Sequence, residues 1–87
     1  MTLYLVDEQF VSIALSYAQS DPGARIVLLQ DGVYAARSGS LRGEVYTIRD
    51  DVSRRGLGTY PFPSNVRMIG YDDLVEMMEK DRVVCFL

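Results

Sequence analysis

The stretch IVLLQDGV, residues 26–33, decides how this chain folds. Its first four residues are apolar without a polar break, and Gln30-Asp31-Gly32 then brings polarity and a turn signal. A short apolar run closed by a turn predicts a strand that is buried on both faces of a sheet. Asp31 is then the expected N-cap of the helix that follows. In open parallel sheets, the carboxyl end of such a strand is where ligands usually bind.

Strands and helices alternate along the rest of the chain. Apolar residues spaced three and four apart predict helices, and short apolar or β-branched runs predict strands. This alternation is typical of a parallel-sheet α/β fold, and we expect a single domain over residues 1–87. The predicted strands cover 1–6, 24–30 or 25–30, 44–48, 66–69 and 83–87, and the predicted helices cover 8–20, 33–36, 50–55 and 72–80.

Composition narrows the possible functions. The chain has no histidine, which removes the commonest general base and the commonest metal ligand. Its net charge of −3 argues against a sequence-independent attraction to nucleic acid. There is no glycine-rich phosphate loop and no apolar run of about 18 residues. We therefore expect a cytoplasmic protein with no cofactor, no direct contact with nucleic acid and no contact with a membrane.

Aspartates follow the first four predicted strands, at Asp7, Asp31, Asp50 and Asp72. If the strands are parallel, these side chains gather at the carboxyl edge of the sheet. One interpretation is a shared acidic site for a divalent cation. The other is four independent helix N-caps, which by itself explains aspartate at these positions. We favour the N-caps and expect no metal site.

Three other features could carry chemistry or binding. Cys85 is the only thiol, and its place in an apolar strand predicts a buried, inert cysteine. Arg54-Arg55 reads as a solvated helix end, with contact to an anion or to an acidic partner as the alternative. Tyr60 and Phe62 stand in a stiff, proline-containing loop. They suit an interface, or they cover one edge of the core.

Three segments, in order, resemble the DsrH/TusB family of sulfur-relay proteins. The first is LLQDGVYAA at 28–36, which is similar to the family's most recognisable signature. The second is VYTIRDDVSRRGL at 45–57, and the third is IGYDDLV at 69–75. The resemblance covers most of the chain from Ile26 to Val75, and it is weaker at both ends of the chain.

The resemblance implies a three-layer α/β/α, DsrEFH-like fold with a mainly parallel five-stranded sheet. It also implies work in complexes with DsrE/TusD-like and DsrF/TusC-like subunits, which pass persulfide sulfur toward 2-thiolation of the tRNA wobble uridine or in dissimilatory sulfur metabolism. In the TusD-like subunit a cysteine near the exit of the third strand carries the sulfur. The matching region here, Ile48 to Asp50, has no cysteine.

We therefore expect a non-catalytic subunit of a sulfur relay, which forms a homodimer in isolation. The signature and interface residues are expected to be Gln30, Asp31, Gly32, Tyr60 and Phe62. One alternative is an enzyme in which Cys85 carries persulfide sulfur. Another is a stand-alone homo-oligomer that binds a small ligand or a metal at the acidic sheet edge.

Overall fold

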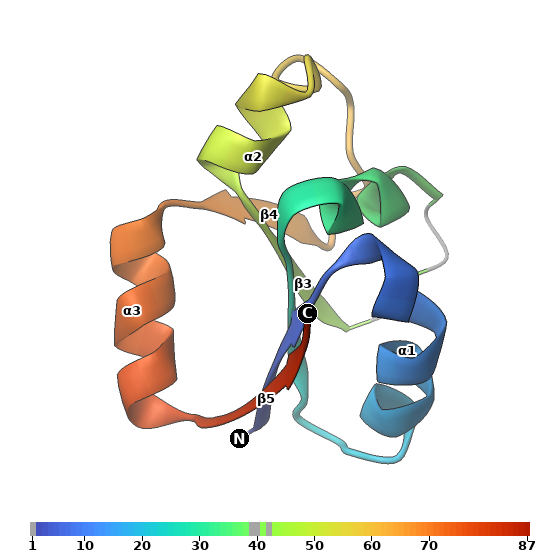
Figure 1. The fold of residues 1–87 in the computed structure, drawn as a ribbon, viewed down its shortest axis with the longest axis vertical. Helices are drawn as coiled ribbons and strands as arrows, with labels where there is room; N and C mark the ends of the chain where they lie inside the picture. Colours follow the sequence, from blue (N-terminus) through green and yellow to red (C-terminus); the bar gives the residue numbers. More distant parts are fainter. Residues whose placement is uncertain (1, 39–40, 42) are drawn as a thin grey trace.

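A computed structural model describes residues 2–38, 41 and 43–87, and it shows a parallel sheet between helices (Figure 1). The strands lie in the order β4-β3-β2-β1-β5, and every neighbouring pair is parallel. The predicted α/β fold with a five-stranded sheet is therefore confirmed. The strands are β1 (Thr2–Val6), β2 (Arg25–Leu28), β3 (Glu44–Ile48), β4 (Val66–Ile69) and β5 (Arg82–Phe86).

Helices cover the two faces of the sheet unequally. The helical segments are η1 (Glu8–Phe10), α1 (Val11–Gln19), η2 (Gln30–Ser38), α2 (Arg49–Arg54) and α3 (Tyr71–Lys80). Figure 1 shows α1 and η2 on one side of the sheet and α3 alone on the other, with α2 beyond one end of the sheet. In the described part of the chain, no helix is long and apolar enough to cross a membrane.

The central strand β2 separates two hydrophobic clusters. Ile26, Val27 and Leu28 are all buried, as the apolar run predicts. Because successive side chains of a strand point to opposite faces, the two clusters draw on alternate residues. The cluster under α1 and η2 includes Tyr4, Val6, Ile26, Leu28 and Val45, and the cluster under α3 includes Leu3, Leu5, Val27, Tyr46 and Ile48.

The structure corrects several predicted element boundaries. Strand β2 ends at Leu28 rather than at residue 30, because Gln30 already has a left-handed backbone and starts η2. The segment predicted as one helix over 8–20 begins as the 3₁₀ turn η1 and continues as α1. The segment predicted as a short helix over 33–36 is longer, since η2 has nine residues.

The predicted helix caps are only partly correct. Asp7 does cap η1, because its side chain accepts the N–H of Glu8. Helix α2 begins after Ile48, so Asp50 stands in its first turn and is not its N-cap. Helix α3 has Gly70 as its N-cap, whose N–H donates to the Asp73 carboxylate over 3.1 Å, so Asp72 is not the cap. Asp31 lies inside η2, and its carboxylate accepts a hydrogen bond from Arg55 instead of capping the helix.

Candidate functional site

The chain turns sharply where it leaves β2, at the carboxyl end of the sheet. Gln30 has a φ of 49°, which is a left-handed conformation that costs a residue other than glycine about 1 kcal/mol. Two residues later, Gly32 packs against the end of β1. A Cβ atom on Gly32 would lie 2.6 Å from the backbone oxygen of Val6, so only glycine lets this turn pack against the end of β1.

A buried carboxylate holds this turn in place. Asp51, in α2, is only 3% exposed, and its Oδ2 accepts the backbone N–H of Gln30 over 2.9 Å. Its Oδ1 lies 3.8 Å from the guanidinium of Arg55. A buried carboxylate that is both hydrogen-bonded and paired with a cation is retained in a fold, whereas an unpaired one is strongly unfavourable. Asp51 therefore joins the turn after β2 to the helix after β3.

Arg55 completes the cluster from the end of α2. Its Nε donates to Oδ1 of Asp31 over 2.8 Å, and its Nη1 donates to the backbone oxygen of Asp51 over 3.1 Å. The hydrogen bond to Asp31 raises the pKa of Arg55, so the guanidinium stays charged. Arg55 is therefore not the solvated helix end that the sequence predicts. Arg54, its neighbour, is exposed.

An open hollow lies beside this cluster. Its lining consists of Gln30, Asp51, Arg54, Arg55 and Tyr71, the last of which is the first residue of α3. These side chains offer an amide, two guanidinium groups and a phenol as hydrogen-bond donors. None of the five is a thiol, an aliphatic hydroxyl or an amine. The hollow can therefore hold a group that accepts hydrogen bonds, and its lining has no thiol that could carry sulfur.

The predicted signature residues fall into two separate groups. Gln30, Asp31 and Gly32 lie together at the turn after β2, in contact with α2 and β1. Tyr60 and Phe62 form an aromatic pair on the loop after α2, with ring centroids 5.0 Å apart. Phe62 packs against the core cluster under α1 and η2, while Tyr60 is exposed. Phe62 thus covers the core, and only Tyr60 presents a ring to the surface.

The prediction of a buried Cys85 is wrong, because its thiol is exposed. The cause is the unequal cover of the sheet. Cys85 pairs with Leu5 in register, which places it on the face under α3. From β5, the edge strand, only Val83 packs into that cluster. Among the described residues α3 is the single helix on this face, and β5 beyond Val83 is open to solvent there.

The four aspartates do not come together as a metal site. Asp7 caps η1, and Asp31 is bonded to Arg55. Asp50 and Asp72 stand exposed in the first turns of α2 and α3. Over residues 2–38, 41 and 43–87, no group of three or more aspartate, glutamate, cysteine or histidine side chains is placed to hold a metal ion.

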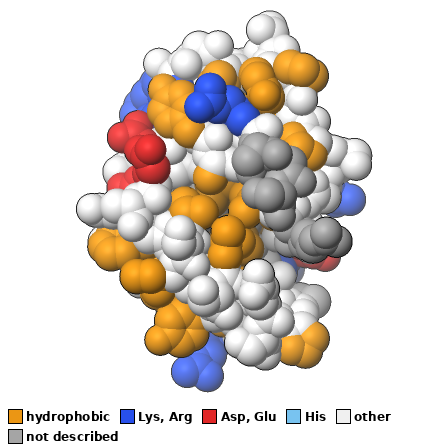
Figure 2. Space-filling view, turned by 90° about the vertical axis from the view of Figure 1, so that its right-hand side faces the viewer, with side chains coloured by type: hydrophobic (Ala, Val, Ile, Leu, Met, Phe, Trp, Pro, Cys, Tyr) orange, Lys and Arg blue, Asp and Glu red, His pale blue; other side chains and the backbone are white. Residues whose placement is uncertain are grey.

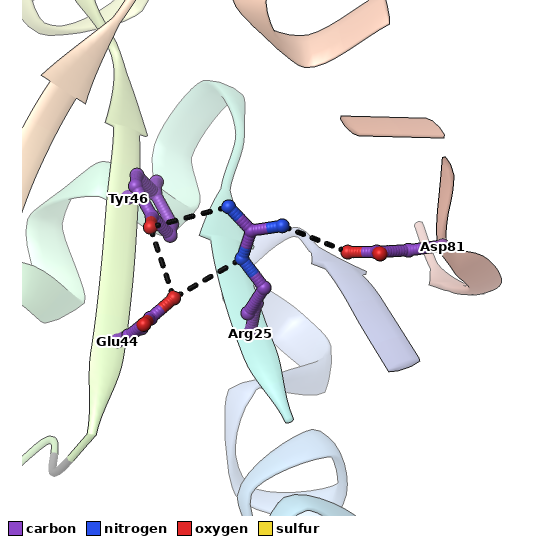
Figure 3. A network of polar contacts seen from close by, with 4 residues as sticks. All are labelled: Arg25, Glu44, Tyr46 and Asp81. Atoms are coloured by element: carbon purple, nitrogen blue, oxygen red, sulfur yellow. Dashed lines mark hydrogen bonds and ion pairs between the residues drawn. The ribbon is translucent and has the colours of Figure 1, made fainter. Parts of the chain in front are cut away.

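A second polar cluster lies at the amino end of the sheet (Figure 3). Arg25 donates to Glu44 over 3.1 Å, to Asp81 over 2.9 Å and to the Tyr46 hydroxyl over 3.4 Å. Its guanidinium also lies 5.4 Å from the centre of the Tyr46 ring. The hydrogen bond to Tyr46, followed by that to Asp81, raises the pKa of Arg25. This cluster ties β2 and β3 to the end of α3.

Sequence reasoning missed the roles of Asp51, Arg55 and Arg25. Asp51 stands in the first turn of α2, yet its carboxylate turns inward and accepts the backbone N–H of Gln30. One signal was present, because an acidic residue four positions before an arginine on a helix forms a neighbouring pair. For Arg25 the partners lie 19 to 56 residues away, and no local pattern indicates them.

Comparisons with known proteins agree with the fold and the signature. The family model described as "DsrH like protein" matches residues 7–84. A protein named "Protein TusB" from Serratia proteamaculans (strain 568) is 40% identical over 68 residues, which cover 69% of this chain and 70% of that protein. The crystal structure of the ychN protein from E. coli superposes with a TM-score of 0.77 over 98% of this chain and 97% of that one. At 15% identity, this last likeness shows the fold alone.

Proposed function

Because this chain belongs to the DsrH family, we propose that it is a subunit of a cytoplasmic sulfur-relay complex with no catalytic residue of its own. In this role it shapes the assembly and helps to present a cysteine of a partner subunit. The proposed partners are DsrE/TusD-like and DsrF/TusC-like subunits. The proposed purpose is 2-thiolation of the tRNA wobble uridine, and on its own the chain forms a homodimer.

The turn at Gln30 is the observation that carries this proposal. Its backbone is strained, it is fixed by the buried carboxylate of Asp51, and it borders the open hollow. A fixed, strained turn is a common feature of binding sites, because the surrounding structure must hold it in place. The hollow supplies hydrogen-bond donors without a thiol, which suits docking of a neighbouring chain rather than sulfur transfer.

Recovery of partners from the native source tests the complex. The tagged chain is expected to bring down cysteine-bearing DsrE-like and DsrF-like chains in constant proportion. The Gln30→Gly variant should recover less of both, because it removes the amide from the hollow. It also relieves the left-handed backbone at residue 30, so recovery should fall without a loss of stability. Gln19→Ala, which removes an exposed amide from α1, is the matched control.

Two results would contradict this proposal in different ways. Absence of DsrE-like and DsrF-like chains from the wild-type preparation would remove the complex itself. Equal recovery by the Gln30→Gly and wild-type proteins would leave the complex in place and remove the hollow as its contact. Thermal unfolding of each variant, followed by circular dichroism, shows whether folding was affected.

A second candidate function rests on the exposed thiol of Cys85. In this alternative, the Cys85 thiolate attacks the outer sulfur of a donor persulfide and gains that sulfur, and the donor leaves as a thiolate. Rapid alkylation by iodoacetamide, together with a mass gain of one sulfur atom after treatment with a persulfide donor, would favour this activity. A thiol that stays unmodified by the donor would exclude it.

A third candidate, a stand-alone binder of a small ligand or metal, has less support from the structure. Asp7 caps η1, Asp31 pairs with Arg55, and the remaining two aspartates at the sheet edge stand exposed in helix turns. A ligand that binds only the folded state must raise the melting temperature. Unchanged melting in the presence of millimolar Mg²⁺ or Ca²⁺ would remove the metal form of this alternative.

A further inference from the structure

Strand β5 is an edge strand with one side unpaired among the described residues. It pairs only with β1, and the Asp7 N–H donates to the Phe86 carbonyl over 2.9 Å. Phe86 therefore turns its backbone groups toward β1. Because these groups alternate sides along a parallel strand, Val83 and Cys85 turn their N–H and C=O groups outward. Such a row of unpaired groups is a template for another strand.

The two edges of the sheet are protected to different degrees. Strand β4, at the far edge, has four residues, carries the exposed Arg67 and follows a loop that contains Pro61 and Pro63. Strand β5 has the sequence RVVCF, with no lysine, proline or glycine. Charge, proline and short length are the usual means by which proteins prevent edges from pairing. Only the β5 edge lacks them along its centre.

An aromatic groove runs beside β5 on the side of α1. It is lined by Tyr4, Tyr17, Val84 and Phe86, with Arg82 and Asp21 among its polar residues. Phe86 packs between Tyr4 and Tyr17, with ring centroids 6.2 and 5.7 Å away, and Tyr17 is 60% exposed. Figure 2, which looks onto the side that carries α1, shows hydrophobic side chains reaching the surface at several places. The groove therefore offers apolar surface along an unpaired edge.

We propose that β5 pairs in antiparallel fashion with β5 of a second copy of this chain, which joins two sheets into one. Directly opposed residues of an antiparallel pair point to the same face, so a two-fold arrangement places one residue opposite its own copy. If the two-fold axis passes beside Val84, every residue of β5 is opposite a residue of the second β5. Val83 then meets Cys85 of the second copy, and these are the residues whose backbone groups face outward.

The same register explains why the occupant is a second copy. It places the exposed Arg82 of one copy opposite Phe86 of the other, beside the aromatic groove. A guanidinium over an aromatic ring is a favourable contact. The acidic pair Asp7-Glu8 follows β1 at the Phe86 end, as the Asp7 to Phe86 bond shows. The Arg82 side chain of each copy thus lies near Phe86 and the acidic pair Asp7-Glu8 of the other copy.

Proline substitutions at the two edges test the pairing. Cys85→Pro removes an N–H that faces away from β1, so it blocks a new strand without breaking the existing sheet. Met68→Pro is the matched control on β4, because the Val45 to Asn65 bond shows that Met68 also faces its N–H outward. In sedimentation experiments at micromolar concentration, Cys85→Pro should raise the dimer dissociation constant about tenfold or more, and Met68→Pro should leave it unchanged.

Cross-linking gives a second readout that does not depend on proline. Opposed residues that do not exchange hydrogen bonds have Cα atoms about 4.5 Å apart, which a disulfide can span. Val84→Cys combined with Cys85→Ser should therefore form a covalent dimer when oxidised glutathione accepts the two electrons. Met68→Cys with Cys85→Ser should not form one.

Three outcomes would overturn the pairing. A wild-type chain that stays monomeric removes both the pairing and the proposed homodimer. A dimer that is equally weakened or equally unaffected by the two prolines has a different interface, although the homodimer stands. If the amide hydrogens of β5 are protected from exchange only when another subunit is present, the edge pairs with a different chain. None of these results bears on whether the sulfur-relay partners co-purify.

Discussion

Two arginine clusters close opposite ends of the same pair of strands, and they are built on opposite principles. At the amino end, Arg25 is the hub, and its charged and polar partners surround it. At the carboxyl end, the central group is the buried carboxylate of Asp51, which accepts the backbone N–H of Gln30 and pairs with the guanidinium of Arg55. The first cluster fastens α3 to the sheet, and the second fixes a strained turn.

The cluster around Arg25 stabilises the fold, whereas the cluster around Asp51 is also a candidate binding site. Around Arg25 the donors and acceptors bond to one another, and the cluster leaves little capacity for a ligand. Around Asp51 the strain is held by the protein, while Gln30, Arg54 and Tyr71 line an open hollow. A strained backbone beside side-chain donors that line an open hollow is a common feature of binding sites.

The largest effect is expected from removing the buried hub. Asp51→Ala leaves the Gln30 N–H without its acceptor and Arg55 without its buried partner, and it should lower the free energy of unfolding by about 3 kcal/mol. Urea denaturation measures this loss. A change below about 1 kcal/mol would mean that the turn at Gln30 does not depend on this carboxylate.

Replacing Arg25 should lower the free energy of unfolding by less than replacing Asp51, because Arg25 is partly exposed to solvent. Arg25→Ala should lower the free energy of unfolding by about 2 kcal/mol, since it leaves the Asp81 carboxylate, which is 8% exposed, without its partner. Arg25→Lys keeps the charge and loses the planar fork, so it should recover less than half of the loss. Full recovery by lysine in the same urea experiment would contradict the role given to the fork geometry.

Relieving the strain should stabilise the fold slightly. Gln30→Gly keeps the N–H that Asp51 accepts and removes the left-handed penalty, while glycine costs some backbone entropy. The net gain should be about 0.5 kcal/mol in the free energy of unfolding. The control is Gln19→Ala, which lies outside this cluster. A clear loss of stability in Gln30→Gly would show that the side chain, and not only the backbone, supports the turn.

The smallest effect is expected at the solvent side of the carboxyl cluster. The Asp31 side chain is 58% exposed, and exposed ion pairs contribute little. Asp31→Ala should change the free energy of unfolding by about 0.5 kcal/mol or less, and 1 M salt should reduce the difference further. Thermal melts at low and high salt check this. If Asp31→Ala loses as much unfolding free energy as Asp51→Ala, the buried and the exposed carboxylates contribute equally to this cluster.

Patterns of hydrophobicity predict the elements of this fold well, and the family signature predicts its class. The buried strand at residues 26–28 and the helix and strand after residue 70 are local features with local signals. The exposure of Cys85 had no such signal, because it depends on one helix covering five strands. The bond from Gln30 to Asp51 joins residues 21 apart in sequence, and only the pairing of β2 with β3 brings them together.

The neighbouring positions of β1 and β5 have a consequence for synthesis on the ribosome. The first strand made is paired on one side by the last, from Thr2 against Arg82 to Val6 against Phe86. Until those final residues emerge, the nascent chain exposes a central strand together with one side of its hydrophobic surface. Contacts so distant in sequence also slow folding. The sheet is therefore completed only after β5 has been made, and the interval before that is when this protein is most exposed to aggregation.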